Sequence, residues 1–244
     1  MKLIFLMMLS FVALSVNAQI ILTPAKKVVD RKWLKNQQYQ MTWYAIKDTS
    51  RFEIGKVTTQ VRNKNDRITV VTQISMQKSK SPWVDTTIAN AGDLMPVYHS
   101  SYNAQRDMVL HFGKVVTGFY TDKINKTTIE IKDTTNKYYF DSNIYPALIS
   151  WLPLKENYKQ DIAIYDYNPK GKTGVLKAWV KDVKKGVFES VKSGPHQVWI
   201  VSVTDEIVGE DALSTYYIDI ENRKLLKQEL NGGGRKMAME LIED

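Results

Sequence analysis

Short segments in which apolar and polar residues alternate recur along most of this chain. The clearest is Arg67–Met76, where Ile68, Val70 and Ile74 stand at every second position with Thr72 between them. Because successive side chains of a strand point to opposite faces, this period of two predicts a β-strand. Similar segments follow one another at intervals of roughly eight to twelve residues, separated by turn sequences. The pattern predicts a mainly β protein built as one antiparallel meander.

The predicted strands are joined by turns rich in Asn, Asp, Gly and Pro. Two of these predicted turns are Asp133–Asn136 and Lys184–Gly186, and Gly55 is expected to mark a bulge or a crossing point. Several strands, such as Gly174–Val183, carry apolar residues on both faces, which favours a single curved sheet wrapped around one or a few helices. We predict strands at 40–46, 51–61, 67–76, 83–89, 94–102, 108–112, 115–120, 127–132, 137–140, 161–167, 174–183, 187–191, 197–203, 213–220, 224–230 and 236–242.

One stretch departs from the strand pattern. No charged residue occurs between Ser142 and Leu154, and the apolar residues that recur there at helical spacing are Ile144, Leu148, Trp151 and Leu152. A helix of roughly ten residues is predicted, closed by Pro153, with Pro146 tolerated in its first turn. The candidates to cap its start are Asp141, Ser142 and Asn143. The helix is expected to seal one end of the curved sheet, as core packing or as a plug over a ligand cavity.

The N-terminus has the form of a secretory signal peptide at residues 1–18, with cleavage after Ala18. Residues 19–37 are interpreted as a polar arm or short helix, and residues 38–244 as one β-rich domain. No further segment is long and apolar enough to span a membrane. The chain contains no cysteine, which excludes disulfides and a lipidated cysteine. These features predict a secreted protein, with the periplasm as its compartment.

The net charge of +8 does not point to nucleic acid, because the lysines are spread over turns and strand faces. The three histidines, His99, His111 and His196, lie on separate segments without zinc-ligand spacing, so no metal is predicted. Gly171–Thr173 lacks the preceding glycine and following helix of a phosphate-binding loop. Ser193 lies close to His196, but we interpret this segment as a turn. The sequence therefore predicts a non-enzymatic protein with no cofactor.

Aromatic residues are frequent on the predicted strands, with 6 Trp, 13 Tyr and 7 Phe in the chain. Aromatic side chains pack well on a sheet, and they also line apolar ligand grooves. If the curved sheet holds a cavity, we predict that its lining includes Trp43, Trp83, Tyr98, Tyr139, Leu148 and Trp151.

Several short segments follow one another in this order: Tyr39–Trp43, Gly92–Tyr98, Trp151–Leu154, Ser193–Trp199, Thr215–Asp219 and Arg223–Lys227. Their order resembles a secreted Gram-negative family of unknown function. The sheet-and-helix plan of that family is similar to that of the periplasmic lipoprotein carrier and its outer-membrane receptor (LolA/LolB-like). The resemblance implies a half-barrel with helices on its concave face, a cavity for acyl chains, and no catalytic residues. This chain departs from the carriers in having a single predicted helix, and from the receptor in having no lipidated cysteine.

Three hypotheses follow. The first is a binding or carrier protein for an apolar ligand, a lipid or lipoprotein acyl chain, held in the concave face of the sheet. The second is an envelope scaffold or protein-interaction module with no small ligand. The third is a hydrolase of cell-wall glycan, for which the carboxylates to test are those of Asp93, Asp141 and Asp219.

Overall fold

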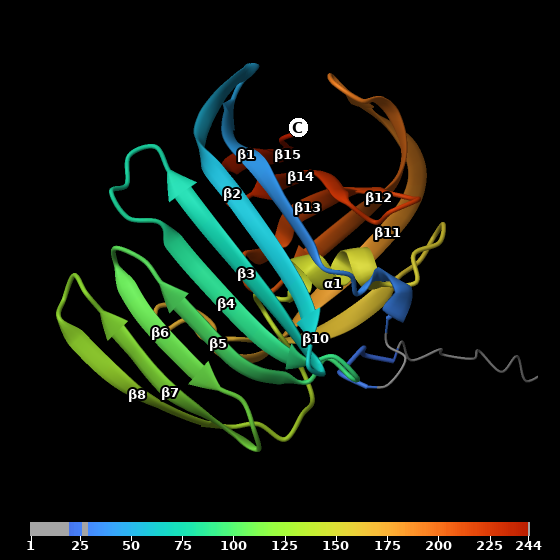
Figure 1. Ribbon diagram of the computed structural model, residues 1–244. Helices are drawn as coiled ribbons and strands as arrows, with labels where there is room; N and C mark the ends of the chain where they lie inside the picture. The colour runs from blue at the N-terminus through green and yellow to red at the C-terminus, as the bar shows by residue number, and fades with distance from the viewer. Residues whose placement is uncertain (1–19, 26–28, 244) are drawn as a thin grey trace, which may run out of the picture.

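The computed structural model describes residues 20–25 and 29–243, which form one fifteen-stranded sheet and very few helical turns (Figure 1). The mainly β prediction is confirmed. The elements in chain order are η1 (Arg31–Trp33), β1 (Gln37–Lys47), β2 (Ser50–Lys64), β3 (Arg67–Met76), β4 (Trp83–Asn90), β5 (Pro96–Tyr102), β6 (Arg106–His111), β7 (Val115–Asp122), β8 (Thr127–Thr134), β9 (Phe140–Asp141), α1 (Tyr145–Trp151), β10 (Gln160–Asp166), β11 (Gly174–Ser190), β12 (Gly194–Asp205), β13 (Gly209–Asp219), β14 (Leu225–Gly232) and β15 (Arg235–Leu241).

The sheet consists of two meanders joined by the first and last strands. Strands β1 to β8 lie side by side in sequence order, and so do β9 to β15. Strand β1 pairs with β15 in the middle of the sheet, with Met41 opposite Leu241. All neighbours are antiparallel except β9 and β10, which run parallel. The two ends of the chain therefore hold the halves of the sheet together.

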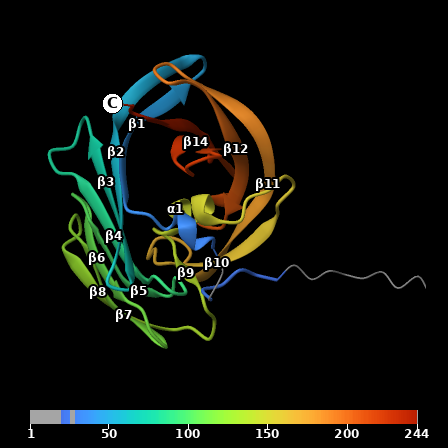
Figure 2. The same ribbon diagram turned by 45° about the vertical axis from the view of Figure 1, so that its right-hand side comes forward.

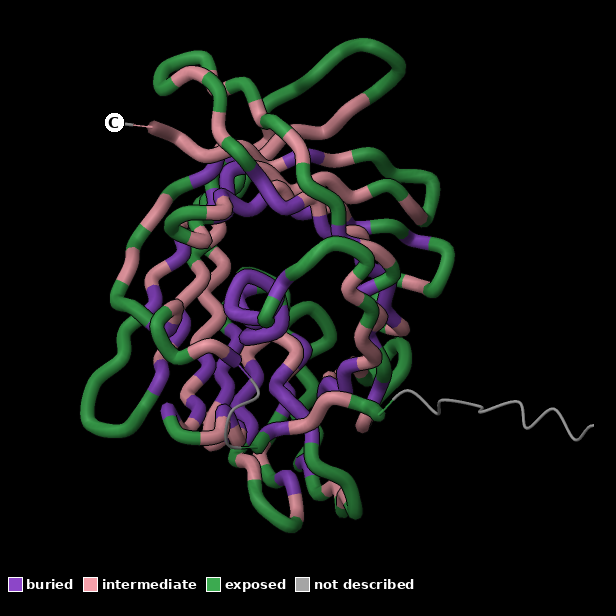
Figure 3. The backbone as a smooth tube through the Cα atoms, turned by 90° about the vertical axis from the view of Figure 1, so that its right-hand side faces the viewer, coloured by how far each residue is buried: buried purple, intermediate pink, exposed green. Residues whose placement is uncertain are grey.

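The sheet curves strongly, and α1 lies inside the curve (Figure 2). Leu148, Ile149 and Trp151 of the helix are almost fully buried against strands from both meanders. The purple segment at the centre of Figure 3 is this helix, with strands on all sides in that view. Six of its seven residues are buried, all except Pro146, and a buried helix can be apolar on nearly every side. This burial explains the absence of charge between Ser142 and Leu154.

Strand β10 is covered on both faces. Ile162 and Ile164 belong to the core around α1, whereas Ala163 and Tyr165 pack into a second cluster with residues of β6, β7 and β8. The Tyr165 hydroxyl donates to Asp133 Oδ2 at 3.0 Å across this contact. The far end of the first meander thus folds over the outside of the second, so the sheet overlaps itself and is not flat.

The predicted helix is confirmed in place but is shorter than expected, with seven residues. Pro146 lies in its first turn, and Leu152 has the extended conformation that a following proline favours. The predicted side-chain cap is wrong: Ile144 is the N-cap and makes no side-chain hydrogen bond. Asp141 and Asn143 point instead toward β4 and β5, where they join a buried polar network.

Two predicted turns are wrong. Residues 184–186 lie inside β11, and each of these three residues pairs with a residue of β12. The strand therefore continues to Ser190 without a turn. Residues 133–136 do not form a hairpin either: β8 pairs only with β7, and Phe140 moves to the parallel edge beside Ile164. Local Lys, Asn and Gly signals were overridden in both places by long-range pairing and packing.

The register shift predicted at Gly55 is present, between Trp43 and Tyr44 of the partner strand. A Cβ atom at Gly55 would lie 2.5 Å from the carbonyl oxygen of Ser75, so only glycine allows β3 to approach this closely. The bulge bends the sheet beside Trp43, which lines the cleft described below.

The predicted signal peptide lies outside the described residues. In the following segment, Leu22 forms a parallel bridge to Ile162, and η1 is a single helical turn. Within the described part of the chain, no helix is both long and apolar enough to cross a membrane.

Candidate functional site

A cleft of about 330 Å³ opens on the concave face of the sheet, next to α1. We call it the concave cleft. Its walls are inward-facing residues of β1 to β4, β14 and β15, and its floor is the start of α1. The lining consists of Tyr39, Met41, Trp43, Val57, Thr59, Val70, Thr72, Ile74, Trp83, Asp85, Asn143, Pro146, Ala147, Leu225, Gln228 and Met239. Most of these side chains are apolar, and the polar ones are few, as in pockets for small molecules.

The alternating sequence explains why these side chains gather there. On β3, Val70, Thr72 and Ile74 are two residues apart and therefore share one face. The neighbouring strands are in register with β3, for example Val61 opposite Val70, so the same face continues across the sheet. Curvature turns that face inward, but α1 is too short to cover all of it.

Trp83 is held in place by its own hydrogen bonds. Its indole Nε1 lies 2.7 Å from Asp85 Oδ1 and 3.1 Å from Ser101 Oγ. The ring is only partly buried, because it stands at the border of the concave cleft and a second cleft of about 460 Å³. We call the second one the loop cleft, since it is lined mainly by the turns that follow β3, β5, β7 and β10. Trp43 lines both as well.

A buried polar network lies behind the concave cleft. Asn143 Nδ2 donates to Thr87 Oγ1 at 3.0 Å, and the Thr87 hydroxyl in turn donates to the Asp141 carboxylate. The other oxygen of Asp141 lies 2.8 Å from His99 Nδ1. His99 and Asp141 are 5% and 0% exposed, so this pair is desolvated. The network anchors β9 and the start of α1 to β4 and β5.

The charge of this pair follows from its surroundings. Burial lowers the pKa of His99, but the charge and hydrogen bond of Asp141 outweigh burial and raise it above 6.5. Near the same site, burial raises the pKa of Asp166, whose Oδ1 accepts a hydrogen bond from Ser142 at 2.7 Å. The network therefore favours an ion pair between His99 and Asp141, with a structural role beneath the cleft.

Two of the six residues predicted to line a cavity, Trp43 and Trp83, stand on the concave cleft. Leu148 and Trp151 do not line the concave cleft, because both side chains are buried in the core around α1. Tyr98 lies against His111, with 5.4 Å between ring centroids, on the face of β5 opposite to His99. Tyr139 packs in the second cluster between Phe112 and Tyr165. The structure does not bring these last four to the cleft.

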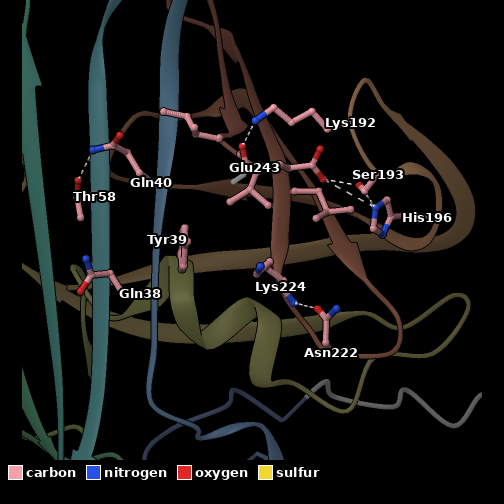
Figure 4. A pocket seen from close by; sticks show the side chains of 13 residues that line it. Gln38, Tyr39, Gln40, Thr58, Lys192, Ser193, His196, Asn222, Lys224 and Glu243 are labelled. Carbon is pink, nitrogen blue, oxygen red and sulfur yellow. Dashed lines mark hydrogen bonds and ion pairs between the residues drawn. The ribbon is translucent and has the colours of Figure 1, made fainter.

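A third cleft, of about 710 Å³, lies where the β11–β12 turn meets the end of the chain (Figure 4). It contains an arrangement that sequence reasoning missed. Ser193 Oγ lies 2.6 Å from His196 Nε2, and His196 Nδ1 lies 2.9 Å from Asp219 Oδ2. Asp219 Oδ1 accepts the backbone N–H groups of Glu221 and Asn222. This is the hydrogen-bond order of a Ser-His-Asp triad.

Glu243 changes what this arrangement can do. Ser193 Oγ donates to Glu243 Oε1 at 2.5 Å, and a hydroxyl has only one proton to donate. The Ser193 proton that points to Glu243 is then not directed at His196 Nε2, whereas a triad requires that nitrogen to accept it. The Ser193 backbone N–H is also engaged, with Ser190 Oγ at 3.2 Å. The cluster thus joins the C-terminal segment to the β11–β12 turn, and Lys192 Nζ adds a bond to the Glu243 carbonyl at 2.6 Å.

Each of the three carboxylates named above as candidates for glycan hydrolysis is bound to a different partner, so no two of them form a pair. Asp141 is buried with His99, Asp219 is bound to His196, and Asp93 accepts the backbone N–H of Met95 in a turn. Among the described residues, no group of three or more His, Asp and Glu side chains could hold a metal ion. The sequence offered no signal for the approach of Glu243 to Ser193, which are fifty residues apart.

Comparison with known proteins gives a family and a fold. A family model described as a protein of unknown function (DUF3108) matches residues 38–240. No curated protein matches the chain. A crystal structure of a beta-barrel-like protein of a domain of unknown function, DUF1849, from Brucella abortus is similar in fold, with a TM-score of 0.51 at 12% identity. The alignment covers 90% of this chain and 98% of that one. The comparisons support the curved β architecture and do not show similarity to the lipoprotein carriers.

Proposed function

The chain belongs to the DUF3108 family of proteins of unknown function, and we propose that it is a secreted periplasmic binding or carrier protein. Its ligand would be an apolar molecule, a lipid or acyl chain, held in the concave cleft. The protein would act by binding and not by catalysis.

The observation that carries this proposal is the cleft itself, about 330 Å³ between apolar strand faces and α1. Its volume is within the range of small-molecule pockets. Trp43 and Trp83 are large and only partly buried at its border, although comparable tryptophans such as Trp151 are fully buried in the core. Transfer of apolar ligand surface from water onto these rings would be favourable at roughly 25 cal/mol per Å².

Native mass spectrometry of the mature protein from its own periplasm, followed by organic extraction, tests the proposal. A co-purifying lipid of defined mass supports it. A bare polypeptide mass, together with no binding of an apolar fluorescent probe, would reject the proposal and direct attention to the scaffold alternative.

A variant pair locates the site. Trp43→Ala is expected to weaken probe binding by about tenfold, as truncation of a buried aromatic contact typically does. The matched control is Trp179→Ala, because Trp179 is also partly buried but lies on the opposite face from the core residues Ala178 and Val180. Equal losses in both variants would place the probe outside the concave cleft.

A second candidate function rests on the Ser193, His196 and Asp219 arrangement: hydrolysis of an ester by a serine nucleophile. Ser193 Oγ would attack the ester carbonyl while His196 Nε2 takes its proton, and His196 would return that proton to the departing alcohol. Water, deprotonated by His196, would then attack the acyl group on Ser193, release the carboxylic acid and restore the serine hydroxyl. The hydrogen bond from Ser193 to Glu243 opposes this order, so binding is the function we favour.

An active-site serine probe distinguishes the two candidates. Covalent labelling of the native protein at Ser193, abolished in Ser193→Ala and strengthened in Glu243→Gln, would favour hydrolysis. We expect no labelling of either the native chain or Glu243→Gln.

A further inference from the structure

The loop cleft adjoins the concave cleft and differs from it in charge. The two share Trp43 and Trp83, so a ligand in one can extend past these rings into the other. The loop cleft carries two cationic side chains, Arg106 from β6 and Lys170 from the β10–β11 turn. The concave cleft carries none, and its one charged lining residue is Asp85.

Of the two cationic side chains in the loop cleft, Arg106 has the more unusual surroundings. Its guanidinium lies 5.4 Å from the centroid of the Trp83 ring and donates from Nη2 to Ser101 Oγ at 3.2 Å. Its Nε is buried and has no hydrogen-bond partner. Within residues 20–25 and 29–243, Arg106 forms no ion pair. A half-buried guanidinium with a free donor is costly unless an acceptor arrives.

The charged groups near Arg106 are already engaged with other partners. Lys170 Nζ lies 3.2 Å from Asp122 Oδ2, and Asp122 Oδ1 also accepts the backbone N–H groups of Ile124 and Asn125. Those hydrogen bonds lower the pKa of Asp122 to about 2, so its charge is fixed and already matched. Asp85 Oδ1 accepts a hydrogen bond from the Trp83 indole Nε1 at 2.7 Å. Burial raises the pKa of the Asp166 carboxyl, and the charge of Arg106 acts in the opposite direction with a smaller effect. Among the described residues, no carboxylate forms an ion pair with Arg106.

From this geometry we propose that the ligand is an anionic amphiphile with a single apolar chain and a carboxylate head. The chain lies in the concave cleft, passes between Trp43 and Trp83, and presents its carboxylate to Arg106. Guanidinium and carboxylate match in shape and charge, which makes this pairing stronger than a neutral hydrogen bond. The inference rests on the proposed function, because it assigns the head group of that same ligand.

The test is isothermal titration of the full mature chain with three ligands of equal chain length, each below its micelle concentration: dodecanoate, dodecanol and dodecyltrimethylammonium. We expect dodecanoate to bind about tenfold or more tightly than dodecanol, as expected for a hydrogen bond to a charged group, and the cation to bind weakest. Arg106→Gln is expected to remove the advantage of dodecanoate over dodecanol. Arg62→Gln, an exposed arginine on the other face of β2, is the matched control and should keep it.

The outcomes separate two claims, the carrier function of the protein and the anionic head group of its ligand. Equal binding of dodecanoate and dodecanol by the native chain overturns the anionic head but leaves the carrier function standing. Tightest binding of the cation also overturns it and points to Asp85. Loss of binding for all three ligands rejects the carrier function itself. The native ranking needs no variant, so a misfolded Arg106→Gln protein would still leave the proposal open to refutation.

Discussion

Two histidine–aspartate pairs in this protein are nearly identical in geometry and differ in burial. His99 lies 2.8 Å from Asp141, and His196 lies 2.9 Å from Asp219. The first pair is desolvated, with side chains 6% and 1% exposed, whereas in the second pair the Asp219 side chain is 6% exposed and the His196 imidazole is 24% exposed. Water can therefore reach the imidazole of the second pair but not that of the first. Loss of the ion pair should be costly to stability in the first place and nearly neutral in the second when the exposed imidazole is the residue replaced.

The largest expected effect is that of Asp141→Asn. Removal of this charge leaves His99 without its counter-ion in the core and disturbs the bonds to Thr87, so we expect a loss of about 3–5 kcal/mol in the free energy of unfolding. His196→Gln, which removes the partly exposed imidazole of the second pair, is the comparison variant and should cost about 1 kcal/mol or less. Urea denaturation followed by circular dichroism measures both. Similar losses would mean that burial is not what separates the pairs.

A smaller effect is expected from pH. The pKa of His99 is raised in the folded state, so the stability that its charge contributes is complete below 6.5 and disappears as pH rises through the higher folded pKa. The urea midpoint of the native chain should therefore fall as the pH is raised from about 6.5 toward alkaline values. In His99→Gln this fall should be largely absent, and in His196→Gln it should persist. A native midpoint that rises over this range would contradict the ion pair.

The smallest effect is expected at the surface cluster. Ser193→Ala removes one exposed link between the β11–β12 turn and Glu243, and it should change the free energy of unfolding by about 0.5 kcal/mol. The local consequence should be clearer: amide exchange in the last residues of β15 should quicken, while exchange in β3 stays unchanged. Faster exchange throughout the sheet would show that the cluster holds more than the chain end.

Much of the fold could be predicted because it depends on local alternation. The strand Arg67–Met76 has the predicted bounds, and Pro146 and Pro153 bracket the helix as expected. The failures share one cause, long-range pairing. Lys184–Gly186 looks like a turn only until β12 supplies a partner for each residue, and Asp141 looks like a helix cap only until His99 lies beside it.

The site was predictable only in part. Aromatic type led to Trp43 and Trp83, but Trp151, Tyr98 and Tyr139 are equally aromatic and lie elsewhere. When both faces of a strand are apolar, a sequence does not say which face is concave. The unpaired state of Arg106 is likewise invisible in sequence, because it depends on which carboxylates other strands bring near.

The sequence by itself determined that this chain forms antiparallel strands around one short, uncharged helix, because strand period, proline positions and the run without charge are local properties. Only the tertiary structure decided which strands meet, which face is enclosed and which charges remain without partners. Those outcomes depend on a sheet that curves and overlaps itself, and curvature is the sum of many small twists and several register shifts, of which the one beside Gly55 is an example. The position of the proposed ligand therefore follows from the assembled sheet and not from any one segment of it.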